Sequence, residues 1–64
     1  MLMIQEELMV EAIDEDTATI KRTNHQKIEY PLSWIPFSVS VGDVFIGTVR
    51  YCQENVVSRI DFDQ

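Results

Sequence analysis

The 64-residue sequence has little cysteine, histidine, glycine or proline: one Cys, one His, two Gly and two Pro. Cys52 has no second cysteine to pair with, so an internal disulfide is excluded, which fits a reducing compartment. One Cys and one His do not make a zinc ligand set. No apolar run approaches the roughly 20 residues of a membrane helix, and the acidic start lacks the basic region of a signal peptide. We therefore expect a cytoplasmic protein with no metal, no cofactor and no membrane partner.

Basic residues are also few, because five Lys and Arg stand against eleven Asp and Glu, giving a net charge of -6. Such a total repels nucleic acid at long range. The charges are distributed unevenly along the chain. Residues 1–16 contain six acids and no base, whereas residues 17–27 contain no acid and four basic side chains, Lys21, Arg22, His25 and Lys27. The sequence is therefore still compatible with one small basic face.

The chain is too short to surround a large substrate pocket, so we expect one domain that is not an enzyme. A catalytic pair of Cys52 and His25 would need contact between two predicted hairpin loops, and we interpret them as an incidental thiol and a surface imidazole. The acidic run 14–16 resembles the start of a calcium loop. It lacks the glycine at the sixth position and the final Glu, so we interpret it as a solvated turn.

Alternating apolar residues and intervening turn residues indicate an all-β protein. The segment 3–13 can also be read as a helix, because its composition favours one, but the following strands need a partner and favour a strand over its second half. The predicted strands are roughly 8–13, 17–23, 27–30, 44–51 and 56–62.

The strand faces follow from the same alternation. Ala18, Ile20, Ile28 and Tyr30 are expected to face inward, as are Val56, Ile60 and Phe62. In residues 44–51 a change of phase predicts a bulge at Gly47. Without that bulge, one face would carry Phe45, Val49 and Tyr51, and the other Val44 and Ile46.

Two prolines bound the connection to the fourth strand. Pro31 ends the third strand, and residues 32–35 are too short for a helix and predict one 3₁₀-like turn before Pro36. Gly42-Asp43 predicts the turn into the fourth strand. We expect Leu32, Ile35 and Val41 to plug one mouth of a barrel.

The stretch 13–44, about half the chain, has an ordered pattern: an acidic turn, a strand, a polar turn, a strand ending in Pro, a Leu-Pro step and Gly-Asp-Val. The residues that carry it are Ile13, Asp16, Ala18, Ile20, Ile28, Pro31, Leu32, Ile35, Pro36, Gly42, Asp43 and Val44. In this pattern the chain resembles an uncharacterised family of short bacterial proteins, a domain of unknown function. It differs at Glu15, where Gly is expected, and at Asn24-His25, where Asp-Gly is usual. The resemblance implies a small β-barrel and no assigned activity.

Five short strands with hairpin links predict a small five-stranded barrel, SH3-like, with an OB-like arrangement as the alternative. The first functional hypothesis is a protein-interaction module or small accessory subunit, with a protein partner or a second copy of the chain. Trp34 and Phe37 are its candidate site, because exposed aromatic residues beside proline anchor partners. The structural alternative is that both complete the core.

Two other hypotheses rest on charge. Lys21, Arg22, His25 and Lys27 flank one predicted hairpin, which could contact the phosphates of RNA or single-stranded DNA. Alternatively, the carboxylates of residues 6–16, with Glu6, Glu7 and Glu11 as the ones to test, could imitate nucleic acid. In that role the chain would be a phage-type decoy inhibitor of a nucleic-acid-binding protein.

Overall fold

The computed structural model describes residues 2–53 and 56–62, which form a single antiparallel sheet. Its five strands are β1 (Leu2–Asp14), β2 (Thr17–Lys21), β3 (Lys27–Pro31), β4 (Val44–Gln53) and β5 (Val56–Phe62). One 3₁₀ turn, η1 (Leu32–Trp34), follows β3 and is the sole helical segment in the described ranges. The predicted all-β class and the short 3₁₀ turn are therefore confirmed.

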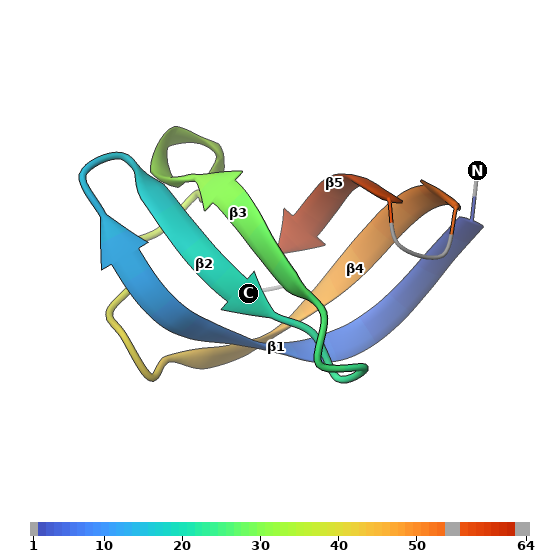
Figure 1. The fold of residues 1–64 in the computed structure, drawn as a ribbon, viewed down its shortest axis with the longest axis horizontal. Coiled ribbons are helices and arrows are strands. Elements are labelled where there is room, and N and C mark those ends of the chain that lie inside the picture. Colours follow the sequence, from blue (N-terminus) through green and yellow to red (C-terminus); the bar gives the residue numbers. More distant parts are fainter. Residues whose placement is uncertain (1, 54–55, 63–64) are drawn as a thin grey trace.

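The strand order β3-β2-β1-β4-β5 is a Greek key with one added strand. Three hairpin-connected strands come first, and β4 returns to lie beside β1 rather than beside β3. The β3 and β5 strands are the two edges of the sheet. Figure 1 shows that the sheet curls into a half-barrel, in which these edges stand on either side of an opening above β1 and β4.

β1 is a strand throughout, so the helical interpretation of residues 3–13 is wrong and the strand begins earlier than predicted. The reason is pairing: residues 2–9 pair with β4 and residues 9–14 pair with β2. Two neighbours override the helix-favouring composition of this segment. A register shift between Val10 and Ala12 marks an extra residue in β1, and such a bulge bends a strand.

The predicted bulge at Gly47 is wrong, because β4 pairs with β1 without a register shift across this position. The alternative without a bulge is correct, since Phe45, Val49 and Tyr51 face the core while Val44 and Ile46 are exposed. Position 47 requires glycine for another reason, because atoms of neighbouring strands leave no room for a side chain. A Cβ there would lie 2.9 Å from Leu8 Cδ1 and 3.2 Å from the carbonyl oxygen of Asp61.

Apolar side chains from every strand build the core. Its buried members are Leu8, Val10, Ala18, Ile20, Tyr30, Ile35, Val49 and Ile60. Ile35 and the half-buried Leu32 cover it as predicted, but Val41 is 63% exposed and Val39 packs in its place. The Gly42 N–H donates to the Val10 carbonyl, which fixes this turn on β1 with Val41 pointing outward.

The N-terminal end of β5 also differs from its prediction. Ile60 and Phe62 contact the core as expected, but Val56 is exposed and Val57 packs inward. The pairing of β5 with β4 shifts register between Arg50 and Tyr51, and this shift reverses the inward phase.

Candidate functional site

The opening between β3 and β5 is bridged by the side chain of Tyr30. Its hydroxyl donates to the carbonyl oxygen of Ile60 at 3.2 Å and accepts from the Ile60 N–H at 3.4 Å. Because β3 and β5 do not pair with each other, this hydroxyl serves the main-chain groups that a neighbouring strand would otherwise bind. Tyr30 therefore fixes the distance between the two sheet edges.

Replacing Tyr30 by Phe is expected to lower the free energy of unfolding by about 1–3 kcal/mol, because two buried main-chain groups of Ile60 lose their partner. Urea denaturation followed by circular dichroism measures this change. Tyr51→Phe is the matched control, since its ring keeps the contact with the Arg22 guanidinium. A loss no larger than that of the control would contradict the bridging role.

Beside this bridge lies a cleft of about 320 Å³, lined by Tyr30, Trp34, Ser58 and Arg59. Its walls come from β3 and η1 on one side and from β5 on the other. The Trp34 ring meets the Tyr30 ring edge-to-face, with centroids 5.5 Å apart, yet the residue is 61% exposed. The volume lies at the lower end of the range for small-ligand sites and suits one or two side chains.

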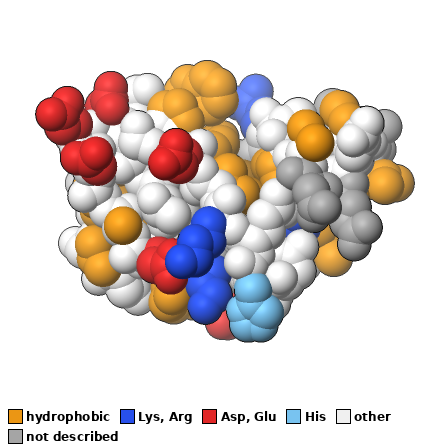
Figure 2. Space-filling view, in the orientation of Figure 1, with side chains coloured by type: hydrophobic (Ala, Val, Ile, Leu, Met, Phe, Trp, Pro, Cys, Tyr) orange, Lys and Arg blue, Asp and Glu red, His pale blue; other side chains and the backbone are white. Residues whose placement is uncertain are grey.

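Arg59 is the one charged residue among those that line the cleft in the described part of the chain. The Asp61 carboxylate lies 2.7 Å from an Arg50 nitrogen and 3.4 Å from the Arg59 Nε, so two guanidinium groups share one carboxylate. The Arg59 side chain is 71% exposed. In Figure 2, apolar side chains and a basic side chain lie together where Figure 1 places the opening. The rim of the cleft is therefore locally positive on an acidic protein.

The structure separates the two residues of the first predicted site. Trp34 is exposed and lines the cleft. Phe37 is half-buried, and its ring centroid lies 5.7 Å from those of both Phe45 and Phe62. Phe37 thus belongs to an aromatic cluster under the loop, and Trp34 alone is presented to solvent.

The predicted basic hairpin is also divided. Arg22 is buried at 6% exposure, and its Nε and one terminal nitrogen lie 3.0 and 3.1 Å from the two carboxylate oxygens of Glu6. Its other terminal nitrogen donates to Gln26 Oε1 at 2.7 Å, and the guanidinium lies 5.5 Å from the centroid of the Tyr51 ring. This guanidinium is therefore directed into the protein and not toward a phosphate.

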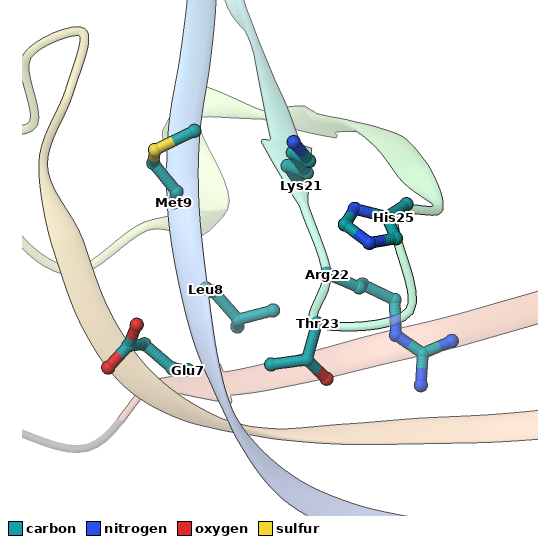
Figure 3. A pocket seen from close by; sticks show the side chains of 7 residues that line it. All are labelled: Glu7, Leu8, Met9, Lys21, Arg22, Thr23 and His25. Carbon is teal, nitrogen blue, oxygen red and sulfur yellow. The ribbon is translucent and has the colours of Figure 1, made fainter.

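Of the three remaining basic residues of the hairpin, Lys27 pairs with an acid, and the other two border one hollow. Lys27 Nζ lies 3.1 Å from Glu11 Oε2. Lys21 and His25 border a shallow hollow of about 180 Å³, whose other lining residues are Glu7, Leu8, Met9, Arg22 and Thr23. Figure 3 shows Lys21 and His25 on one side of β1, with Glu7 turned to the other side. Two of the four predicted nucleic-acid residues therefore pair with acids of β1.

The same pairs divide the acidic residues of the decoy hypothesis. Glu6 is buried against Arg22 and Glu11 pairs with Lys27, which leaves Glu7 as the exposed member of the three. Exposed carboxylates do gather at the β1–β2 turn, as Figure 2 shows. No group of three or more His, Cys, Asp or Glu in the described ranges is arranged to hold a metal ion.

Sequence reasoning did not find the cleft. Tyr30 was expected to face inward, and Arg59 alternates with Ile60, which was also expected to face inward. Neither position indicated that the two strands would form opposite edges of the sheet. The strand order supplies that information. Cys52 is exposed, and no helix of the described residues is long and apolar enough to cross a membrane. Compared with protein-family models, curated proteins and solved structures, the chain matches none.

Proposed function

We propose that the chain is a non-enzymatic protein-interaction module or small accessory subunit that binds an extended segment of a partner in the cleft between β3 and β5. The observation that carries this proposal is Trp34, which is 61% exposed on the wall of a cleft between two unpaired sheet edges. Tryptophan is among the residues most enriched at the energetic centres of protein interfaces. Unpaired edges flanked by side-chain pockets are a common way to bind extended peptides.

The Greek-key order supports an OB-like barrel over an SH3-like one, because the OB fold is a partly open, five-stranded Greek-key barrel. The connection from β3 to β4 carries η1 across one end of the sheet and so brings Trp34 to the opening. The OB-like arrangement is thus part of the proposal, and it explains why the cleft lies where it does.

Nucleic acid is the less supported ligand. The net charge of -6 opposes binding of nucleic acid, and Arg22 and Lys27 already form ion pairs with acidic residues of the same chain. The decoy role has the parallel difficulty that Glu6 and Glu11 serve those same pairs. The protein-binding proposal does not depend on either set of residues.

Trp34→Ala is expected to weaken binding of a partner segment by about 10–30-fold, the effect of removing an interface anchor. The measurement starts with a displayed library of random extended peptides selected on the wild-type chain, followed by affinity measurement of a selected peptide. Because Trp34 is exposed, its loss should change the free energy of unfolding little.

Val41→Ala is the matched control, since Val41 is similarly exposed and does not line the cleft. Selection that enriches no peptide, or peptides that bind Trp34→Ala as tightly as the wild type, would contradict the proposal. Light scattering of the free chain accompanies the test, because a second copy covering the opening would compete with the peptide.

A further inference from the structure

We infer that the segment bound in this cleft carries a carboxylate next to an aromatic or other large apolar side chain. This inference rests on the proposed function and specifies its ligand. It is drawn from the opposite characters of the two walls, one aromatic and one cationic, and from what the main chain of β5 already binds.

The aromatic wall selects the apolar side chain. The perpendicular Tyr30 and Trp34 rings, 79° apart, form a corner that is open to solvent on the Trp34 side. Aromatic pairs favour this edge-to-face arrangement, so a third ring or an aliphatic side chain can extend the cluster. A polar side chain packed against the faces of these rings would lose hydration without gaining a hydrogen-bond partner from those faces.

The cationic wall selects the carboxylate. Asp61 lies closer to Arg50 than to Arg59, at 2.7 Å against 3.4 Å, so a ligand carboxylate can take over Arg59 without leaving Asp61 unpaired. Guanidinium groups bind carboxylates through two parallel hydrogen bonds, which gives both strength and orientation. The acid nearest in sequence on β3, Glu29, alternates with Tyr30 and therefore points to the opposite face of the strand.

Beside the cleft, the main chain of β5 contributes less to the choice of ligand than the side chains of the two walls do. The Tyr30 hydroxyl already binds both the N–H and the carbonyl of Ile60, the groups that an added strand would use. At Ile60 recognition therefore depends on side chains of the ligand, and the two that the cleft can receive are an apolar one and an acidic one.

The experiment compares peptides selected from the displayed library on the wild-type chain. We expect enrichment of Asp or Glu beside Phe, Trp, Leu or Met. In a synthetic copy of one selected peptide, replacing the acid by its amide should weaken binding about twofold to fivefold, as expected for a solvent-accessible charged hydrogen bond.

Arg59→Glu is expected to abolish this difference between the acidic peptide and its amide. Lys21→Glu is the matched control, because it changes the net charge equally and lies outside the cleft, and it should keep the difference. If Glu at position 59 disturbs folding beside Asp61, Arg59→Gln gives the same test without an added negative charge.

The outcomes separate the inference from the proposed function. Trp34-dependent peptides without an acidic preference, or an acidic preference that persists in both Arg59 variants, would overturn the inference and leave the proposed function intact. The absence of any Trp34-dependent peptide would overturn both. An acidic preference that Arg59→Glu removes and Lys21→Glu retains would support both.

Discussion

Replacing Glu6 by Ala is expected to lower the free energy of unfolding by about 3–5 kcal/mol, because it leaves the Arg22 guanidinium buried without its carboxylate. Both side chains are only 5% exposed, so water cannot replace the lost partner. A domain of this size has a total stability of roughly 3–10 kcal/mol. Chemical denaturation should therefore find that the variant has lost a large part of its free energy of unfolding.

The double variant Glu6→Leu with Arg22→Met should recover most of this loss, because apolar side chains of similar size do not carry the cost of burying charges. The comparison of single and double variants by urea denaturation measures the coupling directly. Glu7→Ala, on the exposed neighbour, is the control and should change stability little. A mild effect of Glu6→Ala, similar to that of Glu7→Ala, would show that the buried pair does not have the role assigned to it.

Leu8→Ala is expected to cost about 2–5 kcal/mol, the range for a truncated core leucine. Leu8 is fully buried in the middle of β1, where its Cδ1 lies close to the position that a Cβ on Gly47 would occupy. Truncation therefore opens a cavity beside Gly47 of β4. The free energy of unfolding from urea denaturation measures the cost.

Leu2→Ala is the matched control for Leu8→Ala, because it is the same substitution on the same strand at a position that is 59% exposed. It should change stability by less than about 0.5 kcal/mol. Equal losses at the two positions would contradict a core centred on β1, and would indicate instead that the exposed end of this strand is covered in solution.

Strand positions were predictable because their signals are local. Ala18, Ile20 and Tyr30 alternate as a half-buried strand requires, and the structure buries them all. Two turn residues that are not glycine have a positive φ, Glu15 at 33° and His25 at 70°, in the region that favours glycine. The turns themselves were predicted, but the backbone strain at these two residues was not.

The buried ion pair had a signal that charge counting did not use. Glu6 lies in phase with the inward residues Leu8 and Val10, and Arg22 continues the inward phase of Ala18 and Ile20. When one segment has an acidic residue among its inward-facing positions and another has a basic residue among its own, a buried ion pair between them is expected. Grouping Arg22 with its basic neighbours in the sequence hid this pattern.

The cleft was not predictable for a different reason. Its walls, Trp34 and Arg59, are 25 positions apart in the numbering, and they meet only because β4 returns beside β1 and leaves β3 and β5 as edges. Periodicity shows which face of a strand is buried, but it does not give the order of strands in a sheet. The register shift that exposes Val56 is equally a product of pairing and not of local pattern.

The most direct test of the proposed cleft is an NMR titration of the isotope-labelled chain with a library-selected peptide. We predict that the largest chemical-shift changes fall on the Trp34 indole and on the amides of Tyr30, Ser58 and Arg59, the residues that line the cleft. Changes centred instead on the hollow beside Lys21, or spread along the exposed start of β1, would contradict the assignment of the binding site to the opening between β3 and β5.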